Sequence, residues 1–357
     1  MNCVLSLQTR KMAKCLVIGD PHIRTVEVEF TDIMLDEIVE IAQQKKPDFI
    51  VVLGDTLHSN FKIDANPLCR AVNWLGRLVD IAPLVLLIGN HDIKHNKLRI
   101  DLEKKPEHPF TALKRWKDTI VVDKPTIFEF KGQKFCGVPY IPVGYFHDAI
   151  KDIPALEMTA FFTHPELRGV KYKLTDKEPA DCPDVWPPEY PPNFAGHIHE
   201  YQVVASNLVF IGTPGQQDHG ANKDKAVAII DFSGEKFEME RICLQKIPIR
   251  SEHEFDSGDI TGILGILKEL RESTRIHLTK ITFRGTQTSI KALEKSGPYR
   301  ELKAMKNVVL HPIPTDAGIE STIVEASILP KSLGFLDTVT EMYKHDLEML
   351  KLINELK

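Results

Sequence analysis

The sequence has no apolar run of the length that a membrane-spanning helix needs. About 18 to 20 consecutive apolar residues are required to cross a bilayer, and no such stretch occurs among the 357 residues. The only apolar segment near the start, residues 4–7, is too short for the core of a signal peptide, and Met12 has the form of a natural start. We therefore expect a cytoplasmic protein with no membrane partner, in which residues 1–11 have no catalytic role.

Paired cysteines and a basic excess are also missing. The six cysteines are scattered without a CxxC pair, which argues against a disulfide framework and favours free thiols in a reducing compartment. The net charge of −5 argues against a free-standing, non-specific DNA-binding protein, although local patches and bound metals can still attract nucleic acid. The 43% hydrophobic and 27% charged content is ordinary for a globular protein, and the length allows one large domain and a smaller one.

Strand and helix patterns alternate through the first ninety residues. Buried strands are expected at 15–18, 49–53 and 84–88, with helices from Thr31 and Asn66 between them, each helix capped by that residue. Asp20, Asp55 and Asn90 follow the three strands at a constant spacing of 35 residues (20 to 55, 55 to 90). One βα unit has about this length, so the spacing predicts a parallel sheet whose polar residues gather at one edge.

The second half is richer in strands. They are expected at 126–130, 134–138, 158–163, 208–211, 226–232 and 238–244. Prolines exclude helix from a loop at 173–193, which we interpret as a solvated insertion, with Trp186 and Tyr190 as an alternative wall beside the site. Residues 248–258 are expected to be a boundary. The predicted domains are 13–248, a small α+β domain at 249–330 with elements at 260–272, 276–283, 289–293, 299–305 and 308–310, and an amphipathic helix at 331–357.

Polar residues follow five of the apolar runs, in the clusters 19–22, 54–58, 89–92, 163–164 and 196–199. Seven of them are the candidate metal ligands: Asp20, His22, Asp55, Asn90, His164, His197 and His199. A mixed oxygen and imidazole set suits manganese, iron or zinc rather than calcium, and a carboxylate such as Asp55 can bridge two cations. Two cations held in this way activate water at neutral pH, and phosphate esters are a usual target.

These clusters resemble the motifs of the calcineurin-like metallophosphoesterases, which read DxH, GDxxx, GNHD, a lone histidine and GHxH. All five occur in order over residues 20–199. The resemblance implies an α/β fold, a four-layer αββα sandwich, with two divalent cations per chain. It assigns one cation to Asp20, His22, Asp55 and His199, and the other to Asp55, Asn90, His164 and His197. It also implies that His91 contacts the phosphate and protonates the leaving oxygen.

Within this family, residues 54–58 (GDTLH) resemble the GDLFH of SbcD-type nucleases and lack the arginine of the GDxVDRG found in protein phosphatases. Residues 163–169 and 212–216 resemble segments of phage members of the same group. The resemblance implies a manganese-dependent DNA exonuclease and endonuclease, a homodimer that acts with an SbcC-type ABC ATPase in double-strand break repair and recombination, in a bacterial or virus-infected cell. It assigns DNA capping to 249–330 and ATPase binding to 331–357, and is weak beyond residue 245.

Two other functions stay open: a phosphodiesterase for small nucleotides with 250–330 as a lid, and a DNA-end-binding scaffold for the ATPase. The terminal helix either docks a partner or packs on its own domain. His58 either supports His91 as a second catalytic residue or caps a turn. The expected DNA contacts are basic residues after the third and fourth clusters, each with a solvated surface charge as the alternative: Lys94, Lys97, Arg99, Arg168 and Lys171. Lys225, after the 212–216 loop, is a further candidate.

Overall fold

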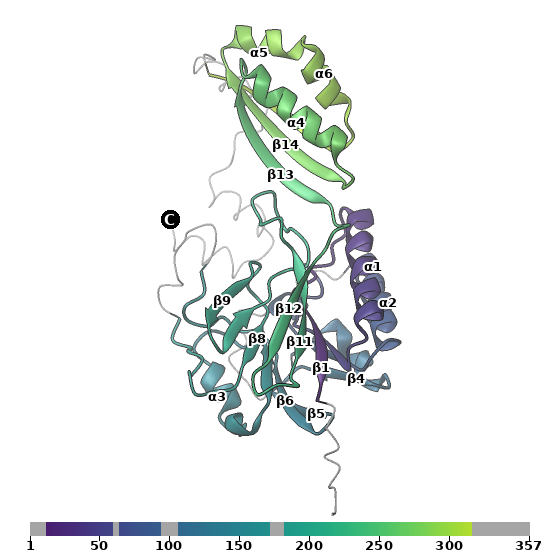
Figure 1. Ribbon diagram of the computed structural model, residues 1–357, viewed down its shortest axis with the longest axis vertical. Coiled ribbons are helices and arrows are strands. Elements are labelled where there is room, and N and C mark those ends of the chain that lie inside the picture. The colour runs from purple at the N-terminus through teal and green to yellow at the C-terminus, as the bar shows by residue number, and fades with distance from the viewer. Residues whose placement is uncertain (1–11, 60–63, 94–105, 172–181, 316–357) are drawn as a thin grey trace, which may run out of the picture. The chain divides into compact units, whose positions relative to one another are not determined.

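The computed structural model describes residues 12–59, 64–93, 106–171 and 182–315 (Figure 1). It divides into two compact units, one made of residues up to 252 together with 273–279, the other of residues 253–272 and those from 280 onward. The helix expected at 331–357 and the end of the 249–330 segment lie outside the described residues. No helix within the described ranges is long and apolar enough to span a membrane.

The first unit contains a six-stranded sheet in the order β12-β11-β1-β2-β3-β4. Its strands are β1 (Lys14–Ile18), β2 (Phe49–Val52), β3 (Leu84–Leu87), β4 (Thr119–Val122), β11 (Ala226–Asp231) and β12 (Glu238–Cys243). The four strands from β1 to β4 are parallel, while β11 pairs antiparallel with β1, and β12 pairs antiparallel with β11. The three expected strands are therefore neighbours with a common direction, and their carboxyl ends share one edge. β4 was not expected from the sequence.

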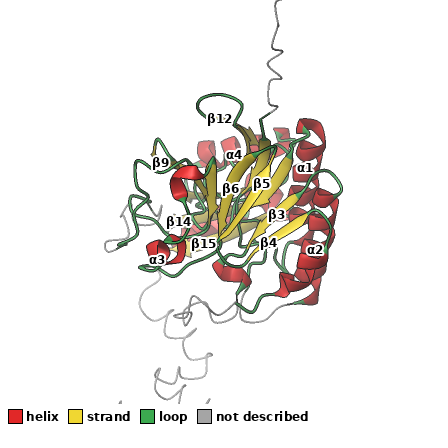
Figure 2. Cartoon of the chain, turned by 90° about the horizontal axis from the view of Figure 1, so that it is seen from below, coloured by secondary structure: helices red, strands yellow, loops and turns green. Residues whose placement is uncertain are grey.

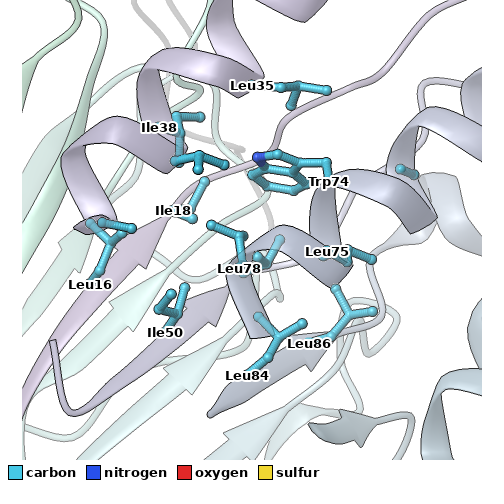
Figure 3. Packing of buried hydrophobic residues seen from close by; sticks show 14 of the residues in the cluster. Leu16, Ile18, Leu35, Ile38, Ile50, Trp74, Leu75, Leu78, Leu84 and Leu86 are labelled. Atoms are coloured by element: carbon cyan, nitrogen blue, oxygen red, sulfur yellow. The ribbon is translucent and has the colours of Figure 1, made fainter. Parts of the chain in front are cut away.

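Helices α1 (Val28–Lys45) and α2 (Ala65–Val79) cover the outer face of this sheet (Figure 2). Every second strand residue points to them: Leu16, Ile50 and Leu84 pack with Ile38 and Trp74 (Figure 3). This alternation follows from the pleat, which sends successive side chains to opposite faces.

The expected caps of both helices are wrong. Glu27 precedes α1 in a left-handed conformation (φ 56°), and its carbonyl accepts from the amide of Thr31 at 3.1 Å, so Thr31 lies inside the first turn. In α2, Asp64 is the N-cap and accepts from the amide of Asn66 at 3.0 Å. Asp64 provides the carboxylate oxygen that the free amides of a first turn need.

A second six-stranded sheet has the order β5-β6-β7-β8-β10-β9. Its strands are β5 (Thr126–Phe130), β6 (Gln133–Val138), β7 (Ala160–Thr163), β8 (Asn193–Ala195), β9 (Gln202–Ala205) and β10 (Leu208–Phe210). Strands β8 and β9 were not expected. β8 immediately follows the proline-rich loop, and the alternation of half-buried and exposed residues in β9 gives it little apolar signal.

The two sheets pack face to face through an aromatic core. Phe49 of the first sheet contacts Phe135 and Phe162 of the second, with ring centroids 5.1 and 6.1 Å apart. The outer face of the second sheet is covered by helix α3 (Phe146–Ile150), the short helix η4 (Ala155–Glu157) and the loop from 182 to 192. The expected four-layer α/β sandwich is confirmed.

The interpretation of the proline-rich loop as a solvated insertion is wrong for its described part. Trp186 is buried, and the centroid of its ring lies 5.0 Å from that of Phe161. Its indole N–H donates to the carbonyl of Pro191. Prolines exclude regular structure there, but they do not prevent the loop from covering the sheet.

The second unit has its own apolar core, in which Ile263, Leu267, Phe283 and Leu302 are almost fully buried. Its helices are α4 (Ile260–Glu272), α5 (Gln287–Glu294) and α6 (Gly297–Ala304), and the strands that reach it are β13 (Ile249–Asp256), β14 (His277–Gly285) and β15 (Val308–Pro314). Thr286 and Ser296 cap the last two helices through their hydroxyls. Strand β13 runs through the segment 248–258, where a boundary was expected, and the division between the two units falls within it, after Glu252.

Candidate metal centre

The seven predicted metal-binding residues follow the carboxyl ends of strands in both sheets. Asp20 and His22 come after β1, Asp55 after β2, and Asn90 opens the short helix η1 (Asn90–Asp92) after β3. His164 comes after β7, and His197 and His199 after β8. Parallel strands within each sheet place their carboxyl ends on one edge, and the packed sheets bring the two edges together.

The structure brings these side chains into contact. Nε2 of His22 lies 3.0 Å from Nε2 of His199 and 3.8 Å from Oδ2 of Asp55. Nε2 of His164 lies 3.4 Å from Oδ1 of Asp55 and 3.1 Å from Oδ1 of Asn90. His197 approaches the same Asn90 oxygen with Nδ1, at 2.9 Å. Asp55 therefore faces both groups of histidines with different oxygens.

Three groups of donor atoms result, each with its three atoms within 4.8 Å of one another. One consists of His22, His58 and His91, and the other two are the donor clusters of the predicted metal ligands. One donor cluster contains Asp20, His22 and His199, and the other contains Asp55, His164 and His197. Oδ1 of Asp20 is buried without a hydrogen-bond partner, a costly state for a carboxylate unless a cation compensates it. The facing ring nitrogens of His22 and His199 and this free oxygen fit a pair of divalent cations.

The backbone at this edge is strained. His22, Asp55 and His197 have φ values of 48°, 45° and 76°, a region that costs a non-glycine residue about 1–3 kcal/mol and is concentrated at functional sites. Gly54 has φ 113°, and a Cβ there would lie 2.9 Å from the backbone of Gly89. Only glycine allows this close approach of the turns that carry Asp55 and Asn90.

Burial and charge pairing shift the pKa values in opposite directions. Burial raises the pKa of Asp20 to about 8. Burial also opposes ionisation of Asp55, but His164 and His22 outweigh it and hold its pKa well below the usual range. His164 is buried too, yet Asp55 and Asp20 raise its pKa to about 9, whereas burial and His164 lower the pKa of His197 to about 3. An Asp55–His164 ion pair therefore lies among neutral groups, and a bound cation would take over the charge of His164.

Asp92 is a functional residue that the sequence reasoning missed. It is buried and accepts from the amides of Gly89 and Leu57 at 3.0 Å each and of Thr56 at 3.3 Å. These bonds fasten the turn after β2 to the turn after β3. The sequence could have indicated it, because Asp92 is the last residue of the GNHD motif and directly follows Asn90, a predicted ligand, and His91, the predicted proton donor.

His91 lies beside the donor clusters and is only half-buried. Its amide donates to Oδ1 of Asp55 at 2.7 Å, and its Nδ1 donates to the carbonyl of His58 at 2.6 Å. The support that His58 gives to His91 thus comes from its backbone. The His58 ring is stacked 5.8 Å from the His91 ring, and burial together with Arg24 lowers its pKa to about 4.

Of the five predicted DNA-binding residues, only Arg168 and Lys171 lie in the described part of the chain. Lys94, Lys97 and Arg99 lie outside the described residues. Arg168 and Lys171 are exposed on the loop after His164, where Arg168 donates from Nε to the carbonyl of Cys182 at 2.9 Å. The expectation of a DNA contact at Lys225 is wrong: this side chain is 3% exposed and donates to the carbonyl of His199 at 3.0 Å. It therefore positions the His199 turn.

Comparison with known proteins gives related sequences of similar length. The protein 078R of Invertebrate iridescent virus 3, which carries the name phosphoesterase, is 28% identical over 341 residues, or 94% of this chain and 93% of that protein. The similarly named 244L of Invertebrate iridescent virus 6 is 27% identical over 286 residues, or 79% of this chain and 98% of that protein. A solved protein of unknown function from Aquifex aeolicus is 17% identical, with a TM-score of 0.27, and covers 48% of this chain and 83% of its own, which is too distant to carry an argument.

The family description of the calcineurin-like phosphoesterases matches residues 13–201, more than half of the chain. The matched region begins just before β1 and ends just beyond His199, so it includes every side chain of the two donor clusters. Metal-dependent hydrolysis of phosphate esters is the chemistry that this donor set supports. The chain belongs to the calcineurin-like phosphoesterase family.

Proposed function

We propose that the protein is a two-metal DNA nuclease of the SbcD type. The observation that carries the proposal is the pair of donor clusters, between which Asp55 faces His164 with one oxygen and His22 with the other, with His91 beside them. Phosphodiester hydrolysis needs this combination of charge stabilisation at the phosphate and a proton donor for the leaving oxygen.

The metals would be held by residues from both sheets. Asp20, His22, Asp55 and His199 would bind one cation, and Asp55, Asn90, His164 and His197 the other. When bound, two divalent cations supply Lewis acidity and a nucleophile at neutral pH. We propose Mn²⁺, because the oxygen and imidazole set suits it and the SbcD resemblance implies it.

His91 would protonate the leaving 3′ oxygen. Because Nδ1 donates to the carbonyl of His58, the ring is held in one orientation and Nε2 is left for the substrate. Histidine is the side chain most often used for proton transfer in enzymes, and a positioned general acid is typically worth about 10²–10⁴-fold in rate. Asp92 would fix the position of His91, because its carboxylate accepts from the amide of Gly89 and so holds the turn that carries His91.

DNA is the proposed substrate for three reasons. The GDTLH turn resembles that of the SbcD-type nucleases and lacks the phosphatase arginine. The viral relatives are named phosphoesterases and align over nearly their whole length, which fits a role in an infected cell. Arg168 and Lys171 are exposed on the loop after His164, where they can bind phosphates. The SbcC-type ATPase and the homodimer belong to this proposal through the resemblance alone.

The test is cleavage of linear duplex DNA and of bis-p-nitrophenyl phosphate with Mn²⁺, by wild type and by His91→Ala. We expect wild type to cleave both and the variant to lose DNA cleavage while still binding DNA. His147→Ala is the matched control, because His147 is exposed on α3 and belongs to none of the donor groups.

The other outcomes separate the alternatives. Full DNA cleavage by His91→Ala would contradict the role given to His91. Cleavage of the small ester alone, unchanged when an SbcC-type ATPase is added, would favour a small-nucleotide phosphodiesterase. DNA-end binding without hydrolysis of either substrate would favour the scaffold.

A further inference from the structure

A pocket opens beside the metal centre, within the first unit. His22, a member of the donor cluster of Asp20, His22 and His199, forms part of its wall. Its other walls are the segment 24–34, the loop 215–217 and residues 247–250.

Two guanidinium groups line the pocket, those of Arg24 and Arg250. Arg250 is neutralised by Glu27, which accepts from Nη1 at 3.1 Å and from Nη2, and its Nε donates to the carbonyl of Gln216. Arg24 has no carboxylate partner at hydrogen-bond distance among the described residues. It donates from Nη2 to the carbonyl of Gln217 at 3.2 Å and to the side-chain oxygen of the same residue.

Arg24 is therefore a half-buried cation held by neutral groups. Because Glu27 pairs with Arg250 while Arg24 is held by the carbonyl and side-chain oxygen of Gln217, Arg24 is the guanidinium of this pocket that can pair with an anion. A guanidinium with free N–H groups in a partly desolvated position is a typical phosphate ligand.

The remaining wall is apolar. It is formed by Val26, Phe30, Met34, Ile247 and Pro248. Phe30 is half-buried, and Val26 is 60% exposed. An aromatic ring and aliphatic side chains next to a phosphate ligand are what a nucleobase needs, since every base has an apolar face for stacking.

The pocket is also fastened to the metal centre through the chain. The hydroxyl of Thr213 donates to the carbonyl of Gly215 at 2.8 Å, and the amide of Thr213 donates to the carbonyl of His199 at 3.0 Å. Arg24 itself is two residues from His22. A ligand that spans the pocket and the metal centre would thus meet a fixed spacing between them.

We propose that this pocket is a nucleotide subsite: Arg24 binds the phosphate next to the scissile one, and the apolar wall contacts the base between the two phosphates. The inference rests on the proposed function and deepens it, because it makes the enzyme selective for a nucleotide chain over an isolated phosphate ester. Arg24 is a binding residue in this scheme and takes no part in bond breaking.

The test compares two ligands that differ by one phosphate, dAMP and deoxyadenosine 3′,5′-bisphosphate, by calorimetric titration of the full chain loaded with Mn²⁺. Wild type should bind the bisphosphate about 10- to 100-fold more tightly, as expected for one charge-assisted contact of about 1.5–3 kcal/mol. Arg24→Gln should reduce this preference to about 1, and Arg24→Lys should keep part of it, because a lysine retains the charge but loses the planar fork.

Arg77→Gln is the matched control, because Arg77 lies on the exposed surface of α2 and pairs with Asp36. It should keep the wild-type preference. A preference that survives in Arg24→Gln, or that is absent from wild type, would overturn the subsite. Failure of the nuclease proposal looks different: DNA would not be cleaved, even with an SbcC-type ATPase, while the Arg24-dependent preference remained and assigned the pocket to a small nucleotide.

Discussion

The middle of the two sheets and their carboxyl edge are built on opposite principles. Between the sheets, Phe49, Phe135 and Phe162 pack in relaxed strand geometry with no polar group to satisfy. At the edge, Asp55 and His22 are as deeply buried, but they are charged or polar and sit on a left-handed backbone. The residues that stabilise the core and the residues that form the metal centre are therefore only a few positions apart along each strand.

The largest effect is expected from Asp55→Asn, which removes the charge of the shared ligand and keeps its shape. Metal content measured by mass spectrometry should fall, and hydrolysis of bis-p-nitrophenyl phosphate should drop below detection. The metal-free protein should unfold at a lower temperature than wild type, because the substitution leaves the buried His164 without the carboxylate that pairs with it. Two bound cations per chain in this variant would show that Asp55 is not a ligand.

The opposite result is expected from Phe162→Ala in the core. Removing a fully buried phenylalanine costs about 3–5 kcal/mol in the free energy of unfolding, measured by urea denaturation. Metal content should stay unchanged under native conditions. Val203→Ala, on the exposed side of β9, is the control and should cost less than about 0.5 kcal/mol. A small effect of Phe162→Ala would mean that the core is loosely packed.

Metal removal should destabilise the protein increasingly as the pH rises. In the metal-free fold, Asp20 and His164 have pKa values raised to about 8 and 9, so their protons stabilise it at low pH and this contribution disappears as the pH rises through those values. Cations compete with the same protons. The difference in Tm between metal-loaded and chelated protein should widen from pH 6.5 to 9, with about 2.7 kcal/mol gained at 100 times the metal Kd. A difference that narrows over this range would contradict the assignment.

The smallest effect is expected from charge reversal on the exposed loop after His164. Arg168→Glu with Lys171→Glu should weaken DNA binding and lower the salt dependence by about 0.9 in the log–log slope for each phosphate that is no longer neutralised. Titrations at several salt concentrations measure both. Lys268→Glu, on exposed α4, tests whether reversing any surface charge has the same effect. Unchanged DNA affinity in the loop variant would remove the proposed DNA-binding role of this loop.

The sequence predicted the parts of the site that depend on local order. The apolar runs before Asp20, Asp55 and Asn90 became neighbouring parallel strands, and the side chains after them met, because pleat and crossover geometry leave little choice. Strands β4, β8 and β9 were missed: all three are short, and β9 alternates between half-buried and exposed residues.

What could not be predicted depends on the meeting of distant segments. Asp92 acts on the amides of Thr56 and Leu57, and backbone partners leave no trace in the side-chain sequence. The pocket beside His22 needs Arg24, Gln217 and Arg250 to meet. Lys225 gave the same signal as any surface lysine, and only its burial shows that it holds the His199 turn.

The three hydrogen bonds that the Asp92 carboxylate accepts from backbone amides have a consequence for the rate of metal binding. They join the turns that carry Asp55, Asn90 and His91 into a single body as soon as the chain has folded. Small zinc domains order their chain only when the metal arrives, whereas here the entropy of bringing the ligands together is spent earlier, during folding. Cation capture should then be limited by how fast the ion sheds its water, and exchange of one metal for another should leave the scaffold undisturbed.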